Sequence, residues 1–187
     1  MKYFELENDM LIMDRWEFGD LIDGNGEELW HTQFTRGTPL SVQLPARACM
    51  YVPGRALDFS TTALCVPIIH ARVKVLLEQL GLQRQVQFIP ITVEGESDPY
   101  FIMNLLRIIR CIDEAKCEEV GHRTVEEGYE DGIGEYYKVS GMRIDPSLVE
   151  EAEIFRPWGW QITFIVSERV KHALERDCVT GTSFIEV

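Results

Sequence analysis

The most regular pattern of hydrophobic and polar positions lies near the C-terminal end of the chain. Residues 161–166 form a short β-branched and aromatic run, which predicts a strand buried over most of its surface. Ser167 follows and suits the N-cap of a helix. The apolar positions of that helix recur at helical spacing: Val170, Ala173 and Leu174. Gly181 then indicates a turn, and residues 183–187 predict a closing strand.

A second helical pattern begins near Pro67, a residue that suits the first turn of a helix. The apolar residues on one face of this helix would be Ile69, Val73, Leu76, Leu77 and Leu80. Gly81 is expected to end it. Residues 86–93 predict a strand, although Pro90 lacks a backbone donor and favours a sheet edge or a bulge.

Residues 101–112 fit two structures. Their apolar positions suit a helix, whereas their dense β-branched residues suit a central strand. We favour the strand, because Pro99 and the preceding strand make a hairpin natural, and the helix stays open.

Residues 1–60 predict short strands and turns. Residues 3–6 and 40–44 alternate in the manner of strands, and residues 23–26 (DGNG) are a strong turn signal. We expect this irregular N-terminal part to wrap around a main core formed by residues 61–187. The chain is thus predicted to be a single α+β domain, residues 1–187, with a mixed, largely antiparallel sheet and two main helices packed on it.

Charge changes this picture. The chain has 31 acidic and 18 basic residues, a net charge of −13, which disfavours nucleic-acid and membrane partners and favours a basic protein partner. Solubility alone is the other explanation. More than half of the excess lies in residues 113–135, where Lys116 and Arg123 are the only Lys or Arg residues. The acidic residues there are Asp113, Glu114, Glu118, Glu119, Glu126, Glu127, Glu130, Asp131 and Glu135.

This acidic stretch also contains several glycines, so a solvated or poorly ordered loop is expected. Residues 136–144 return to strand character. Asp145 and Pro146 then form the signature of a helix start.

Candidate chemistry is sparse. The five cysteines are odd in number and lack CxxC spacing, so we expect buried thiols and no disulfide framework. Cys111, Cys117 and His122 have atypical spacing for zinc, and the sequence contains no nucleotide-binding or G-x-S-x-G motif. We therefore expect no catalytic residue, metal or cofactor. A Cys–His nucleophile pair assembled by the fold stays open.

The loop of residues 156–160 (RPWGW) combines residue types that anchor interfaces, Arg156 and Trp158 in particular. Trp158 is expected to be partly exposed and to contact a partner. Trp160 fits a core position at the entry to the following strand. The N-terminal residues contain no apolar leader, so a cytosolic protein is expected.

Several segments together resemble one family. Residues 57–59 (LDF) ahead of the Pro67 pattern, Tyr100 and Phe101 leading to residues 111–113 (CID), and residues 143–146 (RIDP) carry part of the likeness. The rest is carried by residues 154–156 (IFR), 165–167 (IVS) and 179–181 (VTG). The chain resembles the immunity proteins of bacterial polymorphic toxin systems, specifically immunity family eleven.

The resemblance implies a cytosolic protein that binds and neutralises a cognate toxin, delivered by contact-dependent or type VI secretion machinery. An acidic protein suits a toxin with a basic surface, such as a nuclease. The other open readings are a small hydrolase using a Cys–His pair and an acidic adaptor without a toxin. The residues expected to bind the partner are Glu118, Glu119, Glu126, Glu127, Glu130, Asp131, Arg156 and Trp158.

Overall fold

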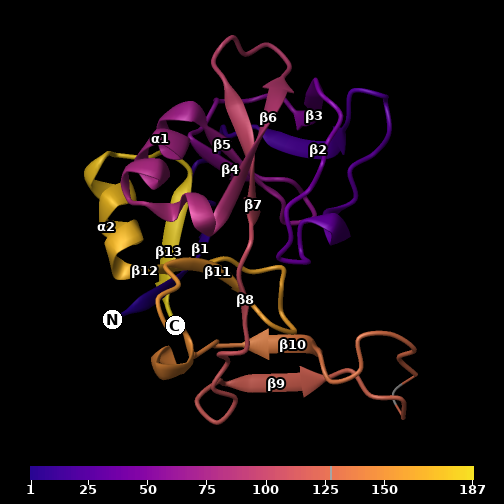
Figure 1. The fold of residues 1–187 in the computed structure, drawn as a ribbon, viewed down its shortest axis with the longest axis vertical. Coiled ribbons are helices and arrows are strands. Elements are labelled where there is room, and N and C mark those ends of the chain that lie inside the picture. Colours follow the sequence, from indigo (N-terminus) through magenta and orange to yellow (C-terminus); the bar gives the residue numbers. More distant parts are fainter. Residues whose placement is uncertain (127) are drawn as a thin grey trace.

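The computed structural model describes residues 1–126 and 128–187, which form two sheets, two α-helices and a projecting two-stranded ribbon (Figure 1). One sheet has the order β2 (Glu17–Ile22), β3 (Ala46–Val52), β6 (Val86–Val93), β7 (Tyr100–Leu105), β5 (Pro67–His70) and β4 (Phe59–Thr61). The other has the order β13 (Thr182–Glu186), β1 (Tyr3–Asn8), β12 (Ile165–Ser167), β11 (Ile154–Pro157) and β8 (Ile108–Ile109).

The helices α1 (Ala71–Gln79) and α2 (Glu168–Arg176) lie against each other beside the strands (Figure 1). Their apolar faces share one core cluster with residues of both sheets, such as Phe4 and Val166 in one and Met103 and Leu105 in the other. Burial of these side chains joins the two sheets into one body. The predicted α+β class with mixed, largely antiparallel sheets is confirmed.

The predicted order of strand, helix and strand at the C-terminal end is confirmed, but the predicted start of the first strand is wrong. Ser167 caps α2 by accepting a hydrogen bond from the amide of Val170 at 3.3 Å. The preceding strand, β12, begins only at Ile165 and pairs with β1 and β11. Residues 161–164 instead form a turn, and there the guanidinium of Arg156 donates to the carbonyl oxygen of Gln161. The sequence of this turn resembles a strand because it contains apolar residues, one of which, Phe164, is buried in the core.

The predicted helix start at Pro67 is wrong. Residues 67–70 form β5, which pairs with both β4 and β7. The helix α1 begins after His70, whose ring nitrogen Nδ1 accepts from the amide of Arg72 at 3.2 Å. Ile69 is buried from the strand rather than the helix. Gly81, in a left-handed conformation (φ +80°), ends the helical segment as predicted.

The strand at residues 86–93 and the hairpin with the next strand are confirmed as β6 and β7, which pair from Val86 with Leu105 to Ile91 with Tyr100. The strand reading of residues 101–112 holds for β7 and β8, with a break at Leu106 and Arg107. Pro90 lies in β6, which is an internal strand and not the edge strand that the proline favoured. It is tolerated because β3 pairs with β6 only from Ile91 onward.

The N-terminal part does more than wrap a core. Its strand β1 is internal to a sheet, between β12 and β13, whereas the turn at residues 23–26 is confirmed by the bond from the Gly26 amide to the Asp23 carbonyl. The strand predicted at residues 40–44 is absent from the described structure, and β3 begins at Ala46. The backbone of Leu40 is bonded instead by the side-chain amide of Gln87. In the part that the structure describes, no helix is long and apolar enough to cross a membrane.

The acidic stretch is more ordered than a loop. It contains β9 (Glu119–His122), which pairs antiparallel with β10 (Tyr136–Ser140). The strand predicted over residues 136–144 is confirmed only as far as Ser140, where β10 ends. Asp145 caps the following segment by accepting from the Ser147 amide at 2.9 Å, but only a 3-10 turn (Pro146–Leu148) forms. The remaining 3-10 turns are His31–Gln33 and Leu82–Arg84.

Candidate functional site

The acidic ribbon, defined as residues 113–140, projects from the lower end of the molecule (Figure 1). It is attached to the body at its base by backbone bonds. The amide of Asp113 donates to the carbonyl of Arg143 at 2.9 Å, and that of Asp145 donates to Cys111 at 2.7 Å. Cys111 is fully buried, so the base of the ribbon is fixed to the core.

Charges near the base and strands of the acidic ribbon are largely paired. Lys138 Nζ lies 2.6 Å from a carboxylate oxygen of Glu119, and Arg123 lies 3.8 Å from Glu135. Glu114 accepts from the hydroxyl of Tyr136 at 2.7 Å and contacts the His122 ring at 3.2 Å. These bonds, that from Tyr136 first, hold the pKa of Glu114 below its ordinary value.

The tip of the ribbon, defined as residues 125–126 and 128–133, differs in that its charges are not paired. Glu126, Glu130 and Asp131 are exposed, and none forms an ion pair with another residue that the structure describes. Glu118 is also exposed and interacts with the Ser140 hydroxyl at 3.3 Å, whereas the predicted Glu127 lies outside the described residues. Excess negative charge of this kind attracts a basic surface.

Apolar and aromatic side chains lie among these charges. Val125 is 70% exposed and Ile133 is 50% exposed, so neither side chain belongs to the core. Tyr129 stacks on Tyr137, with ring centroids 6.0 Å apart and an interplanar angle of 13°. The tip therefore offers both charge and desolvatable area, the two components of a protein interface.

Trp158 follows β11 and is half-buried, as predicted. Its amide donates to the carbonyl of Ile109 at 2.8 Å, and the guanidinium carbon of Arg110 lies 3.7 Å from the centroid of its ring. This cation–π contact fixes the ring while leaving part of it accessible. Trp160 is also half-buried and packs against the core cluster that contains Tyr3 and Phe155.

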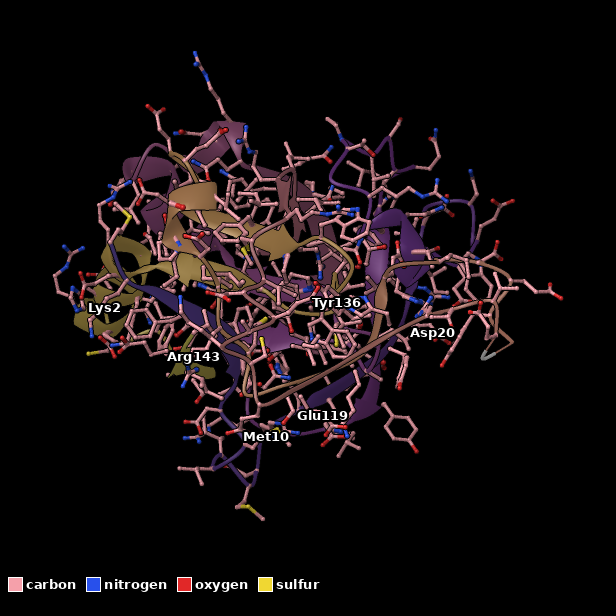
Figure 2. All side chains as sticks on the ribbon, turned by 90° about the horizontal axis from the view of Figure 1, so that it is seen from below. Lys2, Met10, Asp20, Glu119, Tyr136 and Arg143 are labelled. Carbon is pink, nitrogen blue, oxygen red and sulfur yellow. The ribbon has the colours of Figure 1, made fainter. Side chains whose placement is uncertain are left out.

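The structure joins these two predicted regions. The amide of Tyr136, in the ribbon, donates to the carbonyl of Gly159 at 3.1 Å. Arg110, which covers Trp158, also acts electrostatically on Glu114. The acidic ribbon and the Trp158 loop thus meet through residues that are distant in sequence, and Figure 2 shows Glu119 and Tyr136 of the ribbon from below.

Arg156 does not fit the expected partner-binding role. Its side chain is fully buried, donates to the carbonyls of Gln161 and Cys65, and lies over the Phe164 ring at 4.4 Å. Burial lowers the pKa of Arg156 to about 10, so it remains charged at neutral pH. A guanidinium without exposed surface cannot contact a partner in this conformation, and its role here is to bind carbonyl groups of the core.

No hydrogen bond joins a cysteine thiol to a histidine ring among residues 1–126 and 128–187. Cys117 Sγ contacts the backbone of Arg143, and Cys178 Sγ contacts the carbonyl of Arg176. Burial raises the pKa of the Cys111 thiol to about 12, which disfavours the reactive thiolate. Within the same residues, no three His, Cys, Asp or Glu side chains converge as metal ligands.

A cavity of about 460 Å³ at the seam of the two sheets was not predicted. Its lining includes Glu5 and Glu7 of β1, Met10, Val139 of β10, and Trp160. The seam groove, as we call this cavity, unites residues from four parts of the sequence, so no local pattern could reveal it. Met10, which lines the groove, is 63% exposed.

Comparison with known proteins identifies the family of the chain. The family model described as Immunity protein family (Imm11) matches residues 35–187. The matched part includes the acidic ribbon, the Trp158 loop, both helices and most strands. No match is found among curated proteins. Because the family model covers most of the 187 residues, the chain belongs to the Imm11 family of immunity proteins.

Proposed function

We propose that this protein binds a cognate toxin domain, blocks its activity and so protects the bacterium that produces it. Membership of an immunity family supports a protective role in general. The proposed role is binding rather than catalysis, and the proposed location is the cytosol, where a delivered toxin would act. The toxin belongs to a polymorphic system, with type VI secretion as the proposed delivery route.

The observation that carries this proposal is the uncompensated charge on the tip of the acidic ribbon. Glu126, Glu130 and Asp131 carry like charges at the tip, and none of them has an ion-pair partner among the described residues. A basic toxin surface would supply such partners, which favours the complex. Nucleases have such surfaces because they bind phosphate backbones, so a nuclease is the proposed class.

The proposed interface combines the acidic ribbon with Trp158. Glu118 and Glu119 extend the negative surface toward the base, although Lys138 partly neutralises Glu119. Trp158 lies beside this surface and supplies an aromatic anchor. Rim charges of this type mainly speed association, whereas a desolvated aromatic residue mainly slows dissociation.

Coproduction tests the proposal. We propose that the toxin is encoded beside this gene. That toxin domain is produced in a bacterial host with and without this protein, and the purified pair is examined by size-exclusion chromatography. We expect growth to be restored and a stable complex to form. Continued killing, or no complex between folded proteins, would overturn the proposed function.

Substitutions separate binding from catalysis. Each cysteine is changed to Ser and each histidine to Gln, and protection is measured together with the thermal unfolding of each variant. Protection should persist in every variant that folds. Loss of protection in one stably folded variant, with the toxin still bound, would indicate an enzyme instead.

A further inference from the structure

The seam groove lies where β1 of one sheet approaches β4 of the other. The two strands are linked by Asn8, whose side chain donates to the hydroxyl of Thr61 at 2.8 Å and accepts from the Thr61 amide at 3.1 Å. Beside this link, the groove is walled by Trp160, Ile162 and Phe164. Its volume of about 460 Å³ is within the roughly 300–1,000 Å³ common for binding pockets.

The charge in this groove has one sign. Glu5 and Glu7 contribute carboxylates, and its described lining contains no Lys, Arg or His residue. Glu5 accepts a bond from the Thr163 hydroxyl at 2.9 Å, and neither carboxylate has an ion-pair partner among the described residues. Burial, together with the nearby charge of Glu7, raises the pKa of Glu5. The free protein therefore holds a partly desolvated carboxylate without an ion-pair partner among the described residues, which is unfavourable.

The walls suit the stem of a long side chain. Met10 is 63% exposed and Ile162 is 48% exposed, so both present apolar surface at the mouth of the groove. Methionine adapts its shape readily to a bound group. Arginine and lysine place aliphatic stems along apolar surfaces while their charged ends reach polar groups.

The groove is also continuous with the proposed interface. Val139 belongs to β10 of the acidic ribbon, Trp160 ends the loop of residues 156–160 that carries Trp158, and both Val139 and Trp160 line the groove. A toxin that covers the ribbon and Trp158 would therefore reach the mouth of the groove.

We propose that the seam groove receives a cationic side chain, arginine or lysine, from the toxin, with its charged end at Glu5 and Glu7 and its stem between Met10 and Trp160. This inference rests on the proposed function for the identity of the partner. It assigns the groove a role in holding the complex, whereas the exposed charges of the ribbon tip mainly guide association.

The first test compares the double variant Glu5→Gln, Glu7→Gln with the control Glu94→Gln, Glu96→Gln. Both lose two charges, but Glu94 and Glu96 do not line the groove. They lie in the segment between β6 and β7, at the end of the molecule opposite the acidic ribbon (Figure 1). Binding to the purified toxin domain encoded beside this gene is measured by surface plasmon resonance. We expect the groove variant to dissociate at least tenfold faster and the control to match the wild type within twofold. Equal dissociation of the two variants would overturn the inference.

The second test is independent of the toxin. The wild-type protein is titrated with N-acetyl-arginine methylamide, and with the neutral N-acetyl-norleucine methylamide, while backbone amide shifts are followed by NMR. Millimolar arginine probe should shift amides of β1 and residues 160–164, and the groove variant should lose these shifts. No shift there, or equal shifts with the neutral probe, would overturn the cation site. If wild-type protein forms no toxin complex, the proposed function fails, and this titration alone decides whether the groove binds a cation.

Discussion

The ring of Tyr136 lies directly over Gly159, and the Tyr136 amide donates to the Gly159 carbonyl at 3.1 Å. A Cβ atom at position 159 would come within 2.9 Å of that ring. The backbone there has φ +80°, a conformation that glycine adopts without strain. This contact connects the acidic ribbon to the loop that carries Trp158.

Substitution of Gly159 should therefore loosen the ribbon. Gly159→Ala combines left-handed strain, about 1–2 kcal/mol, with displacement of Tyr136. Gly26→Ala is the matched control, because Gly26 has φ +86° and open space around its Cβ position. Hydrogen–deuterium exchange should accelerate at residues 119–140 in Gly159→Ala only. Equal exchange there in both variants would show that the contact does not position the ribbon.

Arg156 should matter for stability rather than for binding. Arg156→Ala removes a fully buried side chain and leaves the carbonyls of Gln161 and Cys65 without their donor. We expect urea unfolding to show a loss of about 2–5 kcal/mol, the range for large buried side chains cut to alanine. Under conditions where the variant is folded, its affinity for the toxin should equal that of the wild type. A tenfold weaker complex would show that Arg156 contributes to toxin binding.

Trp158 should behave in the opposite way. Trp158→Ala is expected to weaken toxin binding by about 2 kcal/mol, roughly 30-fold, the usual magnitude for an interface anchor. Trp30→Ala provides the comparison, because Trp30 is 56% exposed in the N-terminal part. Isothermal titration calorimetry measures both. If both variants bind equally well, Trp158 is ordinary surface.

Glu5 should reduce stability as the pH rises. Its pKa is raised in the folded protein, so the folded state binds more protons than the unfolded state above the ordinary value of 4.5. Stability contributed by this group is present below that pH and is lost as the pH rises through the folded pKa. Glu5→Gln keeps the acceptor for Thr163 and removes this loss.

Thermal unfolding at pH 4 and pH 7 therefore tests the environment of Glu5. The melting temperature of Glu5→Gln should exceed that of the wild type at pH 7, and the difference should shrink at pH 4. Glu94→Gln, at an exposed turn, is the control. A variant less stable than the wild type at pH 7 would mean that a cation of the free protein already pairs with Glu5.

Local patterns predicted the elements whose sequence alone specifies them. Ser167 caps α2 because its hydroxyl reaches the Val170 amide, and the β6–β7 hairpin follows from two adjacent strand-like segments. The start of α1 was misplaced because Pro67 fits both a first helical turn and a strand. Pairing of β5 with β4 and β7, which comes from distant residues, selects the strand.

The candidate site was predicted only in pieces. The charge of the ribbon is a property of a single segment, and the sequence shows it, whereas the partial exposure of Trp158 was predicted from the Pro and Gly residues around it. Burial of Arg156 depends on Cys65 and Phe164, and the seam groove depends on β1, β10 and the segment after Trp160. Such sites need tertiary contacts, which no local spacing encodes.

In the proposed function, the acidic ribbon guides a basic toxin to this protein. The variant Glu126→Lys, Glu130→Lys, Asp131→Lys reverses the charges at the tip, and Glu94→Lys, Glu96→Lys, Glu151→Lys reverses three exposed charges outside the ribbon. Stopped-flow association with the purified toxin domain is measured between about 0.05 and 0.5 M salt, a range that shortens the screening length severalfold.

We predict that wild-type association slows steeply with salt, and that the ribbon variant associates at least about tenfold more slowly at low salt with a flatter salt dependence. The variant reversed outside the ribbon should remain close to the wild type. A ribbon variant that associates at the wild-type rate in low salt would show that these charges do not guide the toxin.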